Sequence, residues 1–242
     1  MSNHLKINAQ FRDPTLSPHD FVEILNRLGS IIDSIAQKHG ELQKNRWRMK
    51  RHSQTEAKLY SEFDEGGASP AALAVLKEEF RNSPNRTYVS IWDGSDAAAS
   101  GISMVCHVGR PGALNLFVVE MLGEYALAEL TNVASIVTRT VQKFNPAYVA
   151  VSPTGYFEKR VFDDKPGVGW MLYLPKIITA QQVPEARALI SVHAAGKQQT
   201  GTIIVSVTDT VFSTNNPEHI EIANRIEIRL VDQDLLPRYV DL

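Results

Sequence analysis

Cys106 and His107 are the first side chains that could do chemistry together, because a thiol beside an imidazole can act as nucleophile and base. They lie in the alternating apolar stretch 101–107, which predicts a β-strand. Successive side chains of a strand point to opposite faces, so these two cannot form a productive hydrogen bond. We therefore expect Cys106 to be a half-buried structural residue beside an edge histidine.

The triplet Glu56-Ala57-Lys58 is a second candidate, because restriction-endonuclease-like nucleases use Glu-x-Lys with an upstream aspartate to hold a metal and orient water. That chemistry needs the triplet on a strand beside another carboxylate. Residues 54–63 instead show the spacing of a helix, with Ala57, Tyr60 and Phe63 on its inward side. The interpretation of Glu56-Ala57-Lys58 as a chance tripeptide is therefore favoured. A metal nuclease built on Glu56 and Lys58 is a hypothesis for function that ranks third, after the two described below.

No other pattern in the sequence indicates a catalytic or metal centre. The seven histidines are scattered without the close pairing that is typical of a zinc site. There is no glycine-rich phosphate loop with its lysine, and Gly101-Ile-Ser103-Met-Val105 lacks the second glycine of a nucleophile elbow. A single cysteine cannot form an intrachain disulfide, which suits a reducing compartment. The sequence therefore predicts no metal, no cofactor and no catalytic residue.

The most basic stretch, residues 44–51, places Trp47 among arginines and lysines, a combination that can serve a nucleic acid. Its alternation also predicts a strand on which Arg46, Arg48 and Lys50 line one face while Trp47 points to the core. Charge on such a face protects the strand from unwanted pairing. The interpretation of these charges as a solvated strand face is favoured over nucleic-acid binding. A nucleic-acid-binding module using residues 44–51 is kept as the alternative to the leading function given below.

Period-two and helical patterns alternate along the rest of the chain. We expect strands over residues 6–12, 87–92, 101–107, 114–121, 148–152, 170–174 and 201–208, and helices over 17–40, 69–80, 124–144 and 217–232. Three consecutive strands with short connections must pair antiparallel. The predicted fold class is α+β, a mainly antiparallel sheet with several amphipathic helices packed on it. Residues 181–200 are ambiguous between strand and helix.

Helix starts are marked by residues that can satisfy the free backbone N–H groups. Ser17 is expected to cap the first helix, with Pro18 in its first turn. Ser69 and Asn216 are expected to cap the helices over 69–80 and 217–232 in the same way.

Length and composition are those of an ordinary globular protein, with 242 residues, 43% of them hydrophobic, and a formal charge of −2. We expect one domain over residues 1–242, and a seam would fall near residues 153–169. The polar N-terminus has no signal-peptide pattern, and no apolar run approaches the length of a membrane span. A cytoplasmic protein that does not engage a membrane is therefore expected.

Several short motifs occur in the order found in one protein family. They are the Trp47 strand, the block Glu56-Ala-Lys-Leu-Tyr60 to Phe63-Asp64-Glu65, Ser69-Pro-Ala-Ala-Leu73, Ile91-Trp92-Asp93-Gly94, Gly169-Trp170-Met-Leu-Tyr173-Leu-Pro175, Gly201-Thr-Ile-Ile-Val205, Asn216-Pro-Glu-His219 and Leu235-Leu-Pro237. In this series the chain resembles the immunity protein 52 family of bacterial polymorphic-toxin systems. The resemblance runs from about residue 5 to 240 and leaves residues 176–200 unmatched.

The resemblance implies an inhibitor without catalysis of its own. Members are expected to bind and neutralise a cognate toxin, usually one with a restriction-endonuclease-like nuclease domain that a type VI or related secretion system delivers. The partner is then a toxin protein, and no direct contact with nucleic acid is expected. Oligomeric state, and the choice between covering the toxin's active site and blocking its self-association, stay open.

A nuclease presents a basic groove for phosphates, so its inhibitor should offer carboxylates for steering and aromatic side chains for a desolvated centre. Trp92 and Asp93 lie at a strand end beside a turn, and Tyr156, Asp163 and Asp164 lie on the irregular segment 153–169. These five residues are the predicted partner interface. For Trp92 the other interpretation is a core residue at the rim of the sheet.

Overall fold

A computed structural model describes residues 4–50, 61–65, 67–95, 100–109, 112–123, 129–194 and 198–242. Within these residues one nine-stranded sheet has the order β10-β11-β9-β8-β1-β7-β6-β5-β2, and all neighbouring strands pair antiparallel. Its strands are β1 (His4–Phe11), β2 (Arg48–Met49), β5 (Thr87–Trp92), β6 (Gly101–Val108), β7 (Asn115–Leu122), β8 (Tyr148–Pro153), β9 (Met171–Leu174), β10 (Ala188–His193) and β11 (Gln199–Val205). This sheet confirms the predicted α+β class and the antiparallel meander.

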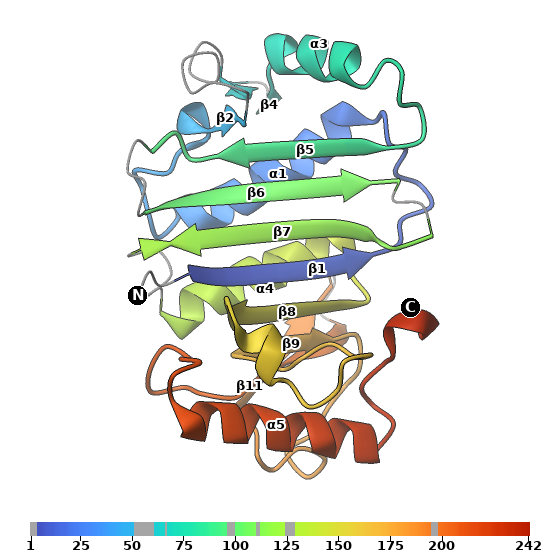
Figure 1. Cartoon of the computed structure of the whole chain (residues 1–242). Helices are drawn as coiled ribbons and strands as arrows, with labels where there is room; N and C mark the ends of the chain where they lie inside the picture. The colour runs from blue at the N-terminus through green and yellow to red at the C-terminus, as the bar shows by residue number, and fades with distance from the viewer. Residues whose placement is uncertain are drawn as a thin grey trace.

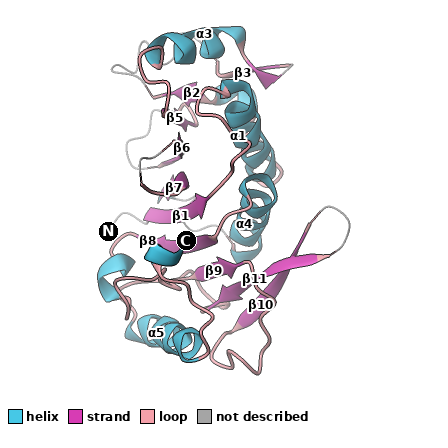
Figure 2. Cartoon of the chain, turned by 90° about the vertical axis from the view of Figure 1, so that its right-hand side faces the viewer, coloured by secondary structure: helices cyan, strands magenta, loops and turns pink. Residues whose placement is uncertain are grey.

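The remaining elements are four helices, three 3-10 turns and one short hairpin within the described residues. They are α1 (Phe21–Ala36), α3 (Pro70–Glu79), α4 (Leu130–Phe144) and α5 (Pro217–Asp232), the 3-10 turns η1 (Lys44–Arg46), η3 (Tyr156–Lys159) and η4 (Tyr239–Asp241), and the hairpin β3 (Phe63–Asp64) and β4 (Gly67–Ala68). Helices α1 and α4 cover one face of the sheet, whereas α5 and η3 lie on the opposite side at the β9–β11 end (Figures 1 and 2). No described helix covers that second face over β1, β7, β6 and β5 (Figure 2).

The alternation of side chains explains which face of the sheet is covered. In β1 the apolar residues Leu5, Ile7, Ala9 and Phe11 are buried, while the polar residues between them are half-buried on the other face. The buried faces of β6 and β7 continue this surface, and the apolar stripes of α1 and α4 pack against it. The helical face of the sheet is therefore core, and the opposite face stays available.

The first helix begins later than the sequence predicts, because a turn intervenes. Asp20 N–H donates to the Ser17 carbonyl over 3.0 Å, and α1 starts only at Phe21. The cap is Asp20, whose carboxylate accepts from Glu23 N–H over 3.3 Å, and not the predicted Ser17. The caps Ser69 and Asn216 are confirmed, since their side chains accept from Ala72 N–H and Glu218 N–H.

Two further local predictions need correction. The strand predicted over 44–51 is reduced to β2, because residues 44–46 form η1, and residue 51 lies outside the described residues. Of the helix predicted over 54–63, residues 54–60 also lie outside, while Phe63 is buried in β3. The ambiguous stretch 181–200 contains β10, and the described part of the helix predicted over 124–144 is α4.

Candidate partner-binding groove on the open sheet face

The strand register arranges the outward side chains of the open face in rows. One row runs from β5 to β8 through Trp92, Ser103, Glu120, Lys6 and Ser152. Directly opposed residues on one face are close enough to interact, as the ion pair of 3.4 Å between Lys6 Nζ and Glu120 Oε1 shows. The open face is thus a mixed polar and aromatic surface.

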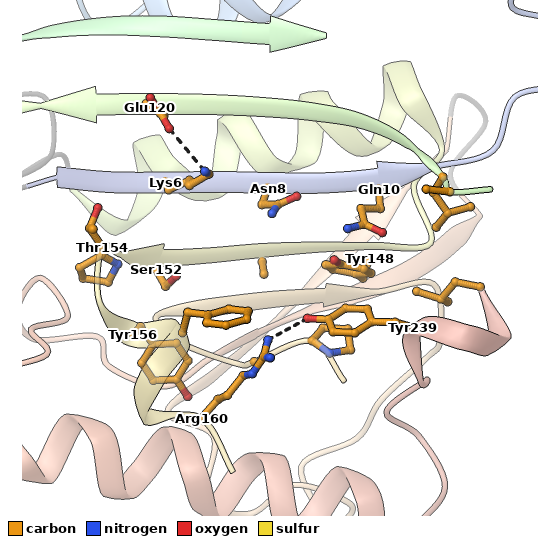
Figure 3. A pocket seen from close by; sticks show the side chains of 18 of the residues that line it. Lys6, Asn8, Gln10, Glu120, Tyr148, Ser152, Thr154, Tyr156, Arg160 and Tyr239 are labelled. Atoms are coloured by element: carbon orange, nitrogen blue, oxygen red, sulfur yellow. Dashed lines mark hydrogen bonds and ion pairs between the residues drawn. The ribbon is translucent and has the colours of Figure 1, made fainter. Parts of the chain in front are cut away.

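A groove of about 1140 Å³ lies on this face between the sheet and the segments that follow β8 and α5 (Figure 3). We call it the sheet groove. Its floor comes mainly from β1 and β8, and its wall comes from η3 and the residues at η4. The principal lining residues are Lys6, Asn8, Gln10, Ala150 and Ser152 on the floor, and Phe157, Arg160, Tyr239 and Val240 on the wall.

Arg160 is the central charged residue of the wall. Its Nη1 donates to Tyr239 Oη over 3.1 Å and its Nη2 donates to the Asp163 carbonyl over 2.8 Å. Its guanidinium lies 3.6 Å from the centroid of the Phe157 ring, a cation–π contact. The side chain is only 5% exposed. These contacts hold the guanidinium in one orientation within the groove (Figure 3).

Behind the wall, the buried carboxylate of Glu227 on α5 fixes the irregular segment. Glu227 accepts from Tyr156 Oη over 2.6 Å, from Val161 N–H over 2.8 Å and from Val168 N–H over 2.9 Å. Burial raises the pKa of Glu227 above its ordinary value, although these bonds and the nearby Arg160 oppose the shift. Burial also raises the pKa of the Tyr156 phenol. The segment is therefore anchored to α5 by one carboxylate.

Three buried polar atoms of the groove have no hydrogen-bond partner within the described residues. They are His4 Nε2, Asn8 Oδ1 and Arg160 Nε. Buried polar groups in proteins are almost always paired, so unpaired groups in a groove are candidates for pairing with a bound partner. The Nε atom of Arg160 forms an ion pair with Asp163 Oδ1 at 3.8 Å, which is longer than a hydrogen bond.

The structure places the five predicted interface residues in two separate regions. Trp92 is half-buried at the edge of the meander and Asp93 is 1% exposed, its carboxylate accepting from Ser95 N–H and Ile102 N–H at 3.0 Å each. Tyr156 is buried against Glu227. Asp163 is exposed, and Asp164 accepts from Arg238 Nε over 2.9 Å. Asp93 and Tyr156 thus make internal bonds, while Trp92, Asp163 and Asp164 keep exposed surface.

The other candidate residues from the sequence analysis are Cys106, His107, Glu56 and Lys58. Cys106 is fully buried, which raises the pKa of its thiol to about 12, and His107 on the opposite face packs edge-on against Tyr88. The prediction that Cys106 and His107 point apart is confirmed, although Cys106 is more deeply buried than expected. Glu56 and Lys58 lie outside the described residues. Within the described residues, no three His, Cys, Asp or Glu side chains gather as a metal site, and no helix could span a membrane.

Most of the described basic side chains of the stretch 44–51 are bonded to groups of their own chain. Lys44 pairs with Asp33 at 2.7 Å, and Arg46 donates to the Glu41 carbonyl over 3.3 Å. Arg48 Nη1 donates to the carbonyl groups of residues 45 and 47 over 2.6 and 2.8 Å. Trp47 is buried, as its alternation predicts, so it cannot stack on a base.

The family model of immunity protein 52 matches residues 21–238, most of the chain. The chain belongs to the immunity protein 52 family. Membership supports an immunity role and implies that the protein binds a cognate toxin. No curated protein matches the chain.

Among solved structures, the fold is similar to that of the Pseudomonas aeruginosa T6SS protein PA0821, with a TM-score of 0.53. The two chains are 11% identical, and the similarity covers 98% of this chain and 77% of that chain. At this identity the likeness concerns the fold alone. Strand β1 and residues 239–242, which supply part of the sheet groove, lie outside the residues that match the immunity protein 52 family.

The residues of the groove that sequence reasoning missed carried only weak signals. Lys6, Asn8 and Gln10 alternate with apolar residues, which predicts an outward face but not a groove. Glu227 interrupts the apolar stripe of the helix over 217–232, a signal that could have marked a buried carboxylate. Arg160 has no sequence signal, because its partner Tyr239 is 79 residues away.

Proposed function

We propose that this protein protects the cell that makes it by binding one cognate toxin in a stoichiometric complex. The single observation that carries the proposal is the family match over residues 21–238. The preformed sheet groove supports it, since a partner can bind such a surface without ordering a disordered segment. The protein then works by binding, and catalysis on its own surface has no part in protection.

We further propose that the toxin is a restriction-endonuclease-like nuclease delivered by a type VI secretion system. The nuclease follows from the resemblance to immunity proteins that usually oppose such toxins, and the delivery route is supported by the structural neighbour, which is a T6SS protein. A nuclease acts where the nucleic acid is, so its inhibitor belongs in the cytoplasm. The exposed carboxylate of Asp163 can steer a basic surface, a role that salt weakens.

No contact in the described structure favours the alternative of a nucleic-acid-binding module. Three basic side chains of the stretch 44–51 are bonded to their own chain, and its tryptophan is buried. The alternative would require salt-sensitive retention of DNA or RNA that is lost when Arg46, Arg48 and Lys50 are neutralised. We expect no retention in a filter-binding titration at low salt.

Co-expression tests the proposed function. The toxin domain encoded by the neighbouring gene is induced in cells with and without this protein, and survival is counted. We expect survival only with the protein, and we expect the purified pair to form a stable complex. Equal killing in both strains would overturn the immunity role.

An in vitro assay tests the nuclease separately. The toxin domain is incubated with plasmid DNA and with RNA, and this protein is titrated in. We expect cleavage to fall to zero at one equivalent of inhibitor. A toxin that kills but cleaves neither substrate would overturn the nuclease assignment and leave the immunity role standing.

A further inference from the structure

We infer that the sheet groove is the site that captures the toxin, and that it recognises a protruding acidic segment whose carboxylate enters the groove beside Arg160 and Lys6. This inference rests on the proposed immunity function and adds the surface and the chemistry of the partner. It is carried by the charge of the lining, by Arg160 Nε, which has no hydrogen-bond acceptor within the described residues, and by the exposed apolar rim.

The lining of the groove is cationic, although the whole chain has a formal charge of −2. Its charged side chains are the cations Lys6, Arg12 and Arg160 and the carboxylate Glu120, and Arg12 Nη2 donates to the Leu242 carbonyl at the same groove over 2.6 Å. Glu120 lies in the row of Lys6 and pairs with it, which shows how a carboxylate is received there. Complementary charge selects a partner and excludes others, so an acidic segment fits this groove and a basic one does not.

Arg160 supplies a prepared donor for that carboxylate. Its side chain is 5% exposed, and its Nε has no hydrogen-bond acceptor within the described residues. Glu227 already accepts three hydrogen bonds, and Asp163 Oδ1 forms an ion pair with Arg160 Nε at 3.8 Å, which is beyond hydrogen-bond distance. The guanidinium lies 3.6 Å from the centroid of the Phe157 ring, and its Nε is the N–H group left for a carboxylate, the acceptor that arginine matches best.

The floor of the groove suits an extended chain. Asn8 Oδ1 and His4 Nε2 are buried and unpaired within the described residues, so they can exchange hydrogen bonds with a backbone laid along β1. The volume of about 1140 Å³ exceeds the usual range of small-molecule pockets. Both features favour a peptide segment over a small ligand.

Two apolar side chains at the rim provide the desolvated part of the contact. Phe157 is 66% exposed and Val240 is 75% exposed, and both line the groove. Aromatic side chains are enriched in protein interfaces, and arginine is enriched among the residues that carry most of the binding energy, so Phe157 beside Arg160 is a suitable anchor and Val240 adds apolar area. The captured segment should therefore carry apolar residues next to its acidic one.

Two serines in the same row give a matched steric test. Ser152 lies in the groove, whereas Ser103 faces the same side of the sheet but outside the lining, and both are half-buried. Binding of the catalytically inactive toxin domain from the neighbouring gene is measured by calorimetry. We expect Ser152→Trp to weaken Kd at least tenfold and Ser103→Trp to leave Kd within twofold of the unsubstituted protein.

Charge reversal gives an independent test that needs no bulky residue. We expect Lys6→Glu to weaken Kd about tenfold and to remove most of the salt dependence of association, because the charged side chains of the lining then balance. Lys143→Glu, an exposed position on α4 behind the sheet, should leave both unchanged. A photo-crosslinking residue at position 157 should attach to a toxin peptide that contains Asp or Glu next to apolar residues.

The outcomes separate the two proposals. If the unsubstituted protein does not bind the toxin domain, the proposed function and this inference both fall. If it binds and neither Ser152→Trp nor Lys6→Glu weakens binding, the groove is wrong and the immunity function stands. A crosslinked peptide that is basic would overturn the acidic segment while leaving the groove as the surface.

Discussion

Asp93, one of the five predicted interface residues, has a buried carboxylate that closes a turn of its own chain. The Asp93-Gly94 pair indicates a turn, and Gly94 has a φ of +73° there, a conformation that favours glycine. The Asp93 carboxylate closes this turn by accepting two backbone N–H bonds. Its acidity is therefore used inside the molecule, in contrast to Asp163, whose side chain is 99% exposed.

Replacing Asp93 should cost stability. Asp93→Ala leaves two backbone N–H groups without their acceptor, which should lower the free energy of unfolding by about 2 kcal/mol. Asp163→Ala is the matched control and should change it by less than about 0.5 kcal/mol. Urea denaturation measures both variants. An Asp93→Ala protein as stable as the control would show that the turn does not depend on the carboxylate.

Glu227 should give the protein a pH-dependent component of stability. Its pKa in the folded state lies above the ordinary value of 4.5 because of burial. Between these two values the folded state holds a proton that the unfolded state has lost, so this contribution is fully present below pH 4.5 and falls as the pH rises through the folded pKa.

Glu227→Gln isolates this contribution because glutamine does not titrate. We expect the difference in urea midpoint between the variant and the unsubstituted protein to move in favour of the variant as the pH rises from 4.5. A difference that moves toward the unsubstituted protein would mean that the three hydrogen bonds outweigh burial and that the folded state favours the ionised carboxylate.

At the scale of elements, the start of α1 shows what local capping rules leave undecided. Ser17 and Asp20 are both good caps, and both precede a helical pattern. The structure uses Asp20, because a turn stabilised by the Ser17 carbonyl comes first and Thr87 Oγ1 donates to the Pro18 carbonyl from β5. The contact with β5 is tertiary, so the local sequence cannot report it.

The two candidate caps make opposite predictions. Asp20→Ala removes the acceptor for Glu23 N–H and should destabilise the protein by about 1 kcal/mol. Ser17→Ala leaves the helix N-terminus intact, because Ser17 acts mainly through its backbone carbonyl, and should cost less than half as much. Thermal unfolding of the two variants compares them. A larger loss for Ser17→Ala would restore the cap that the sequence predicts.

At the scale of the whole molecule, one sheet joins the two halves of the chain. The buried apolar residues of the described chain, except Leu114 and Val118, form one contiguous cluster from Leu5 to Leu236. Among the described strands of four or more residues, β8 and β9 share the fewest paired residues, Val149↔Tyr173 and Ala150↔Leu172. This junction lies beside the segment 153–169, where the sequence places a seam, and the expectation of one domain over 1–242 stays a prediction.

Cooperativity of unfolding tests that expectation. Buried Trp47 and Trp170 report on the two halves through their fluorescence, and circular dichroism reports on the whole chain. We expect all transitions to coincide in urea, as they do for a single cooperative unit. A variant that keeps only Trp170 and unfolds at a different urea concentration from the circular dichroism signal would divide the chain into two domains.

The sequence by itself determined the elements and much of the sheet. Alternation in β1 and β6, helical stripes in α1 and α5, and short connections between β5, β6 and β7 are local patterns, so they could be recognised without a structure. The same locality placed Tyr156, Asp163 and Asp164 on the irregular segment that became one wall of the groove. It also supplied the motifs of the family.

Only the tertiary structure decided what these elements build together. The sheet groove needs Lys6 at one end of the chain, Arg160 in the middle and Tyr239 at the other end, brought together by the strand order and by the anchoring of η3 to α5. A residue's role there depends on neighbours far away in sequence. Such contacts leave no periodic trace, because packing and charge pairing act through space and not along the chain.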